Sequence, residues 1–224
     1  MVKYEKPSVT ADIIIFTIQN QKLKVLLIKR GVEPFKNMFA IPGGFVKMNE
    51  NLEQAAKREL EEETGVKEVY LEQLYTFGEV NRDPRGRVIT VAYFALINPE
   101  KAKQELEATT DASAAEWFDV SGLPQLAFDH KKILDYAIKR VKWKFEYTTI
   151  AFSMLPKHFT LTQLQKVYET VFEKKFDKRN FRKKILSLNI LESTEEKEKD
   201  VSYRPPELYS LKKSITIGKI IEMI

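Results

Sequence analysis

The chain contains, at residues 43–66, the stretch GGFVKMNENLEQAAKRELEEETGV, in which two glycines precede a charged segment that is free of glycine and proline up to position 65. Asn51, with Gln54 three residues later, can cap the start of a helix. Gly65 can adopt the left-handed conformation that commonly ends one. The stretch therefore predicts a single helix over 52–64, entered through a glycine turn.

The glutamates of this expected helix are spaced so that three of them share one face. At about 100° per residue, Glu59, Glu62 and Glu63 fall within a stripe roughly 100° wide, whereas Glu61 points to the far side. Like charges this close repel one another, and a divalent cation removes the conflict. Ligands that are all oxygen suit Mg²⁺ or Mn²⁺. The alternative for a bare run of glutamates is a solvated face laced by pairing of Arg58 with Glu62.

The spacing of the whole stretch resembles the signature of the Nudix hydrolase superfamily. Gly44, Glu50 and the run RELEEETGV at 58–66 match every defined position of that signature. The resemblance implies a domain that uses Mg²⁺ or Mn²⁺ to bind the diphosphate of a nucleoside-linked ligand and to hydrolyse it. It implies Glu59 and Glu63 as direct metal ligands.

The other charged positions of the signature have supporting roles in this resemblance. Glu62 assists the metal ligands, and Arg58 and Glu50 form a salt bridge that orients the carboxylates. Gly43 and Gly44 let the backbone approach metal and phosphates closely. The signature does not identify the general base, which in many relatives is a glutamate of a later loop; the candidates here are Glu79, Glu105, Glu107 and Glu116.

A second segment indicates the chemical class of the ligand. YTFG at 75–78, followed by NRDPRGR at 81–87, resembles the corresponding segment of ADP-ribose pyrophosphatases and their regulator relatives. Arg82, Arg85 and Arg87, held in a loop rich in Pro and Gly, could form charge-assisted hydrogen bonds to a diphosphate. The resemblance implies ADP-ribose or a related nucleotide sugar. The alternative is a solvated turn between two strands.

The rest of the first half predicts a sheet. Runs of β-branched and aromatic residues predict strands, the first two joined by a polar turn, at 9–18, 23–28, 69–77, 88–97 and 116–118. Because strands and helix alternate without a regular βαβ rhythm, we expect an α+β fold. The family resemblance specifies a Nudix α/β/α sandwich around a mixed sheet.

The second half is helical in its pattern. Apolar residues at three- and four-residue steps predict a linking helix over 129–145. Thr160, with Gln163 three residues later, predicts the start of a second helix, and Asp177 that of a third. Two short apolar pieces around a charged stretch follow, which is the element order of a winged helix-turn-helix.

The net charge of +5 divides unevenly along the chain. Residues 1–130 carry 16 basic and 20 acidic side chains, and residues 131–224 carry 21 and 12, which gives −4 and +9. An acidic half suits a cation, and a basic half suits a polyanion. We expect a Nudix domain with its linking helix over 1–145 and a DNA-binding domain over 150–224.

The second half resembles the DNA-binding domain of Nudix-related transcriptional regulators of bacterial NAD and sugar metabolism. The segments that carry the resemblance are FDH at 128–130, LPKHFTL at 155–161, DKRNFRK at 177–183 and YRPP at 203–206. A basic helix can offer side chains to DNA phosphates and base edges, and the candidates are Lys178, Arg179, Asn180, Arg182 and Lys183. A symmetrical double-stranded operator would imply a homodimer. The alternative is a basic face that only keeps the protein in solution.

Composition excludes several classes of function. The chain has no cysteine, which excludes disulfides, thiolate metal sites and a cysteine nucleophile. No run approaches the roughly 18 apolar residues of a membrane span, and the first residues lack a signal-peptide plan, so we expect a cytoplasmic protein. His130 and His158 are expected to cap or pack, because they lie outside the carboxylate helix.

Three functions remain open. The leading one is a DNA-binding transcriptional regulator whose Nudix domain binds, and can hydrolyse, ADP-ribose or a related nucleoside diphosphate sugar. The alternative is an ADP-ribose pyrophosphatase whose C-terminal domain is structural. A third, a housecleaning triphosphatase, would leave the arginine loop without a role.

Overall fold

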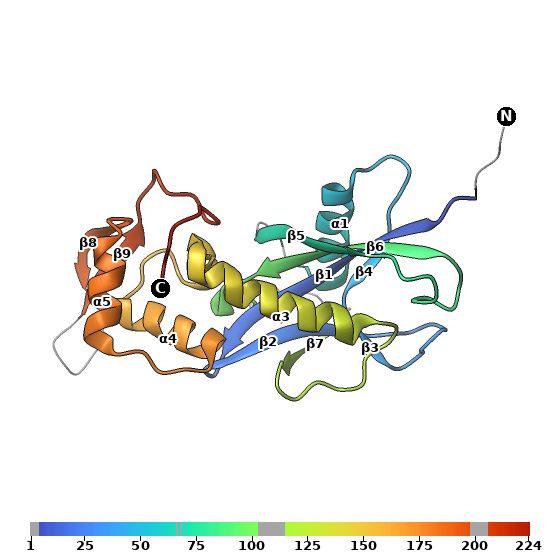
Figure 1. Cartoon of the computed structure of the whole chain (residues 1–224), viewed down its shortest axis with the longest axis horizontal. Coiled ribbons are helices and arrows are strands. Elements are labelled where there is room, and N and C mark those ends of the chain that lie inside the picture. Colours follow the sequence, from blue (N-terminus) through green and yellow to red (C-terminus); the bar gives the residue numbers. More distant parts are fainter. Residues whose placement is uncertain (1–4, 66, 68, 103–114, 198–205) are drawn as a thin grey trace.

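The computed structural model describes residues 5–65, 67, 69–102, 115–197 and 206–224 (Figure 1). A mixed sheet occupies one half of an elongated molecule, and the helices that follow α3 form the other half. Among the described residues no helix has the length and apolar character needed to cross a membrane.

The sheet is built around a long hairpin, as expected. β1 (Ser8–Gln19) and β2 (Lys22–Lys29) pair antiparallel through a turn whose two residues, Asn20 and Gln21, have positive φ. β1 pairs parallel with β6 (Val88–Leu96), which pairs antiparallel with β5 (Tyr70–Phe77). β3 (Phe39–Ala40) and β7 (Ala115–Asp119) add to β2, and β4 (Gly43–Phe45) adds to β1. The one parallel pair makes the sheet mixed.

One helix covers each face of this sheet. Ile13 and Ile15 of β1 pack under α1 (Leu52–Thr64), whereas Ile14 and Phe16 face the core that includes α3 (His130–Tyr147). Both sets are fully buried, which is why residues 13–16 of β1 form an unbroken apolar run and do not alternate. The α/β/α sandwich expected from the sequence is confirmed.

The second half is a winged helix. After a 3₁₀ turn (Thr149–Met154) come α4 (Leu161–Phe172) and α5 (Lys178–Ser187), then the antiparallel pair β8 (Leu191–Lys197) and β9 (Glu207–Leu211). The predicted caps are present: the side chains of Thr160 and Asp177 accept the amides of Gln163 and Asn180 at 3.1 and 2.8 Å.

Three features have no counterpart in the sequence predictions. The short strand β3 precedes the two glycines, the short strand β4 contains both of them, and the 3₁₀ turn follows α3 directly. The C-terminal segment runs back along the end of α3, where the Ile221 amide donates to the Tyr147 carbonyl at 2.8 Å and Met223 is fully buried. Such pieces are fixed by tertiary contacts, which periodicity does not record.

Candidate ligand and metal site

The carboxylate helix α1 begins and ends where the sequence predicts. The Asn51 side chain accepts the Gln54 amide, and the Gln54 side chain accepts the Asn51 amide, both at 2.9 Å. Gly65 has φ +71° and ends the helix. The glutamates between these caps are therefore held on a rigid frame.

Arg58 gathers the acidic side chains around it. Its guanidinium donates to both carboxylate oxygens of Glu50 at 2.9 and 2.6 Å, and to Glu59 at 2.6 Å and Glu62 at 3.0 Å. The hydrogen bonds from Arg58 lower the pKa of Glu50 to about 2. The predicted Arg58–Glu50 salt bridge is present, and it turns the guanidinium toward the metal-face carboxylates.

Glu63 is the carboxylate left in an unfavourable position. Burial, and then the neighbouring Glu59, raise the pKa of Glu63 to about 7. Its Oε2 is buried without a hydrogen-bond partner among the described residues. Glu59 is also buried, Glu62 lies half exposed at the rim, and Glu61 pairs with Lys67 at 2.5 Å. The predicted face is thus formed by two inward carboxylates and one at its edge.

The two glycines are required by protein atoms. A Cβ on Gly43 would overlap the Ala11 carbonyl and Asp12 of β1, and one on Gly44 would overlap the Glu59 carboxylate. The glycines therefore let β4 lie against β1 and seat Glu59. The sequence argument had attributed them to the approach of backbone to metal and phosphate, and both do line the cavity described below.

The residues present fit a hard divalent cation. The donors are carboxylate oxygens, and a buried Glu63 oxygen lacks a partner. No three His, Cys, Asp or Glu side chains in the described part of the chain are grouped closely enough to hold a metal ion as they stand. The reason lies in the hydrogen bonds above, since Arg58 occupies oxygens of both Glu59 and Glu62.

A cavity of about 430 Å³ lies in front of this cluster, within the size range of small-molecule sites. Of the predicted residues it brings together Gly43, Gly44, Glu62, Glu63, Arg82 and Arg85. Its other charged or aromatic lining residues include Asp12, Arg30, Phe128 and His130. The cavity is thus lined by both carboxylates and arginines, the side chains that a divalent cation and a diphosphate would each need.

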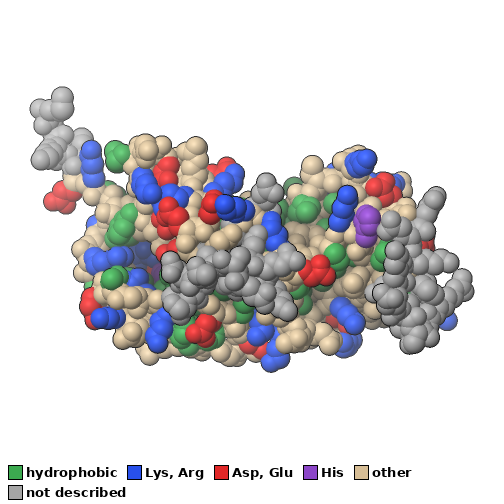
Figure 2. Space-filling view, turned by 180° about the vertical axis from the view of Figure 1, so that it is seen from behind, with side chains coloured by type: hydrophobic (Ala, Val, Ile, Leu, Met, Phe, Trp, Pro, Cys, Tyr) green, Lys and Arg blue, Asp and Glu red, His purple; other side chains and the backbone are tan. Residues whose placement is uncertain are grey.

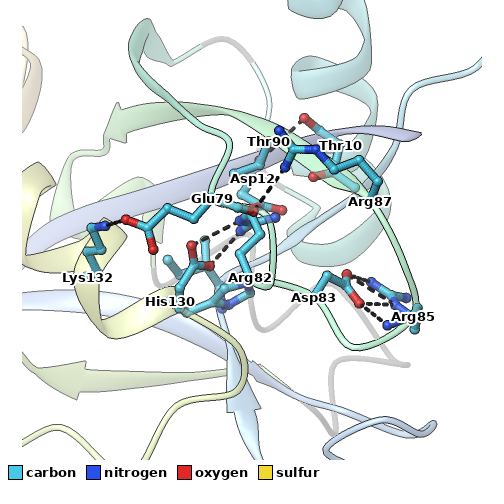
Figure 3. Close-up of polar contacts among 12 residues, drawn as sticks. Thr10, Asp12, Glu79, Arg82, Asp83, Arg85, Arg87, Thr90, His130 and Lys132 are labelled. Carbon is cyan, nitrogen blue, oxygen red and sulfur yellow. Dashed lines mark hydrogen bonds and ion pairs between the residues drawn. The ribbon is translucent and has the colours of Figure 1, made fainter. Parts of the chain in front are cut away.

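The three predicted arginines lie in different surroundings (Figure 3). Arg82 is buried, with only 3% of its side chain exposed, and donates to both oxygens of Asp129 at 3.0 and 2.6 Å. Arg85 is held by Asp83 at 2.7 Å and lines the cavity. Arg87 points back over the loop, donates to the Glu79 carbonyl at 3.0 Å, and does not line this cavity.

Arg85 is more accessible than Arg82. Its side chain is 39% exposed, and its guanidinium carbon lies 5.2 Å from the ring centres of both Phe45 and Phe128. The hydrogen bonds that Arg85 donates to the Asp83 carboxylate raise the pKa of Arg85. This geometry presents a fixed, stacked cation to the cavity.

His130 corrects one expectation. As predicted, it packs: it is buried, and its Nδ1 accepts the Ile41 amide at 2.9 Å. Burial lowers the pKa of His130, which favours this neutral acceptor form. However, it lines the same cavity as Glu63 and is not outside the site. Distance along the sequence from the carboxylate helix was a poor guide, because α3 starts beside β3.

Neither of the two described candidates for the general base lines the cavity. Glu79 pairs with Lys132 outside the cavity, and Glu116 is exposed on β7. Glu105 and Glu107 lie outside the described residues. Asp12 was missed, although an acidic residue inside the apolar run ADIIIF was a signal for it.

The predicted DNA-binding residues of α5 differ in their exposure to solvent. Lys178, Arg179, Asn180 and Lys183 are exposed, whereas Arg182 is half buried and donates to the Thr162 hydroxyl of α4 at 3.2 Å. Figure 2 shows Lys and Arg side chains spread over the reverse face of the molecule and interleaved with Asp and Glu. The basic surplus of the second half therefore has its clearest organisation on α5.

The fold and site define a class. Residues 7–137 match the family model described as NUDIX domain, and residues 151–211 match the one described as NrtR DNA-binding winged helix domain. The chain belongs to the Nudix family and carries a winged helix of the NrtR type.

Individual relatives and solved structures are similar to this chain over one or both of its halves. The chain is 38% identical over 210 residues to the ADPR responsive transcriptional repressor NtrR of Acinetobacter baylyi, which covers 92% of this chain and 82% of that protein. It is 43% identical over 142 residues to the ADP-ribose pyrophosphatase of Methanocaldococcus jannaschii, covering 63% and 77%. The crystal structure of Shewanella oneidensis NrtR complexed with a 27mer DNA has a TM-score of 0.81 at 34% identity, covering 96% and 99%. The expected combination of Nudix and winged-helix domains is confirmed.

Proposed function

We propose that this chain is an ADP-ribose-responsive transcriptional repressor whose Nudix domain can also hydrolyse its ligand. The observation that carries the proposal is the joining, by one continuous helix α3, of a cavity lined with carboxylates and arginines to a winged helix with an exposed basic α5. The relatives that share both halves support the repressor, and the archaeal pyrophosphatase supports the chemistry. We place the domains at 1–145 and 150–224.

In the first half, Glu59 and Glu63 would hold Mg²⁺ or Mn²⁺ with Glu62 assisting from the rim. The bound cation would neutralise phosphate charge and polarise the phosphoryl oxygens. Arg58, braced by Glu50, sets the direction of Glu59 and Glu62.

The proposed ligand-binding side chains are Arg82 and Arg85, which both line the cavity. Arg85, stacked between Phe45 and Phe128, would bind a diphosphate oxygen directly, and Arg82 would do so from a buried position. Gly43 and Gly44 complete the wall. Arg87 is not part of this set, because it bonds outside the cavity.

In the second half, Lys178, Arg179, Asn180 and Lys183 would contact operator DNA from the exposed side of α5. We do not include Arg182, because its contact to Thr162 holds it against α4. We propose a homodimer, since a symmetrical operator pairs with a two-fold protein.

The test measures both activities on one preparation. Fluorescence anisotropy follows binding of a DNA fragment from upstream of the protein's own gene with and without ADP-ribose, while chromatography follows release of AMP. We expect sequence-specific binding that responds to ADP-ribose, and AMP release that requires Mg²⁺. Absence of specific DNA binding at moderate salt would leave the pyrophosphatase with a structural C-terminal domain as the function. Sensitivity of AMP release to Glu59→Gln tests the metal assignment separately.

A further inference from the structure

The first residues of α3 line the ligand cavity although the helix leads to the other domain. Phe128 and His130 belong to the cavity wall, and Asp129 lies in the adjoining recess beside Arg82. The close-up shows Arg82 directed at this end of α3 (Figure 3). A ligand that binds Arg82 would thus lie next to the start of α3, the helix that connects the two domains.

Asp129 occupies the N-cap position of α3 and yet caps nothing. Its φ and ψ are −93° and 19°, outside the extended region of an ordinary N-cap, and its side chain makes no capping hydrogen bond within the described structure. The N-cap side chains of α1, α4 and α5 all accept a backbone amide of their helix. Both Asp129 oxygens are instead taken by Arg82, at 3.0 and 2.6 Å.

This carboxylate therefore has two competing sets of partners. One is the buried guanidinium of Arg82, which has Asp12 as a second anion at 3.8 Å. The other is the set of amides at the start of α3, for which aspartate is a preferred cap. A diphosphate bound by Arg82 would compete for the same guanidinium donors and shift Asp129 toward the helix.

The backbone beside Asp129 can absorb such a change. Phe128 has φ +52°, an unfavourable conformation for a bulky residue, and lies immediately before the cap position. At the far end of α3, Phe145 is fully buried and its ring lies 5.4 Å from Tyr168 and 6.5 Å from Phe172 of α4. A movement of α3 would therefore act on the winged helix through this packing.

We propose that Asp129 couples the ligand cavity to the DNA-binding domain by exchanging Arg82 for the amides of α3 when a diphosphate ligand binds. The inference rests on the proposed function, since it requires that ADP-ribose alters DNA affinity. Asp129 acts through Arg82 and is a positioning residue.

The experiment compares the full-length protein with Asp129→Asn, Asp129→Glu and a matched control, Asp135→Asn. Asp135 lies on the same helix in an exposed pair with Lys131. For each protein the operator-fragment Kd is measured by anisotropy with and without ADP-ribose, in EDTA so that the ligand is not consumed. The ratio of the two Kd values is the coupling factor, and calorimetry gives the Kd for ADP-ribose.

We expect the control to keep the coupling factor of the unsubstituted protein and Asp129→Asn to reduce it to within about twofold of one, with ligand-free DNA affinity retained. ADP-ribose should bind Asp129→Asn at least as tightly as it binds the unsubstituted protein, because asparagine competes less with the diphosphate for Arg82. Asp129→Glu keeps the charge pair with Arg82 but caps a helix poorly, so it should also reduce the coupling factor. This variant tests the proposal if Asp129→Asn does not fold. A coupling factor in a folded Asp129 variant equal to that of the control overturns the proposal. A factor of one in the unsubstituted protein overturns the proposed function itself, and the two failures are therefore distinct.

Discussion

Replacing Glu63 by glutamine should stabilise the metal-free protein, because it removes a carboxylate that is ionised against its surroundings. The pKa of Glu63 rises from 4.5 to about 7 on folding. At roughly 1.4 kcal/mol per pKa unit, ionisation costs the folded state about 3 kcal/mol at pH 8. Because the pKa of Glu63 is raised in the folded state, the protonated carboxyl contributes stability that is fully present below about pH 4.5. That stability is lost as the pH rises through about 7. Glutamine does not titrate, so the advantage of the variant should shrink to about 1 kcal/mol at pH 5.

The assay is thermal unfolding in EDTA at several pH values. For a chain of this size 3 kcal/mol corresponds to roughly 6 to 12 °C in Tm. Glu61→Gln is the matched control, since Glu61 forms an exposed pair with Lys67 on the other side of the helix and should change stability by less than about 0.5 kcal/mol. Adding Mg²⁺ should raise the Tm of the unsubstituted protein and not that of Glu63→Gln. Equal Tm values for the two variants in EDTA at pH 8, or a difference that does not narrow toward pH 5, would refute the reasoning.

Three further predictions concern the glycine turn, α5 and ligand turnover. Gly44→Ala places a methyl group where the Glu59 carboxylate lies, and calorimetry should show Mg²⁺ affinity about tenfold to a hundredfold weaker; unchanged affinity would contradict the role given to this glycine. Arg179→Ala should weaken operator binding by about 1–3 kcal/mol with no change in Tm. Arg182→Ala, by contrast, should lower the Tm because it removes the contact to Thr162. The two variants are compared by anisotropy and by thermal melting, and the reverse pattern would show that the roles of the two arginines had been exchanged. With Mg²⁺ present, the effect of a single addition of ADP-ribose on DNA binding should decay as AMP appears, and it should persist in Glu59→Gln; a persistent effect in both proteins would argue against hydrolysis.

The sequence predicted the carboxylate helix closely because every determinant of that helix is local. Asn51, Gln54 and Gly65 set its ends, and 3.6-residue geometry alone places Glu59 and Glu63 on one face. Five strands of the sheet, β1, β2, β5, β6 and β7, were likewise predicted to within a residue or two, whereas the short strands β3 and β4 were not predicted.

The cavity could be predicted only in part, because its wall is assembled from separate elements. Asp12 comes from β1 and His130 from the start of α3, and no spacing rule relates them. Nor does composition distinguish Arg82 from Arg87: both follow Asn81 in one basic loop, and only the fold supplies Asp129 to bury one of them and the Glu79 carbonyl to hold the other aside.

The arrangement also explains how one site can both signal and hydrolyse. The metal-face carboxylates come from α1, which packs on one face of the sheet, and Asp129 belongs to α3, which packs on the other. The two sets share no hydrogen bond within the described structure, and they meet only through a ligand that spans the cavity. Because the groups proposed to cleave the diphosphate and those proposed to report its presence are held by different helices, a substitution can abolish one activity without the other. An intact carboxylate helix in a repressor is therefore compatible with sensing: under the proposed function it would limit how long the ligand persists, while Arg82 and Asp129 would determine the response of the winged helix.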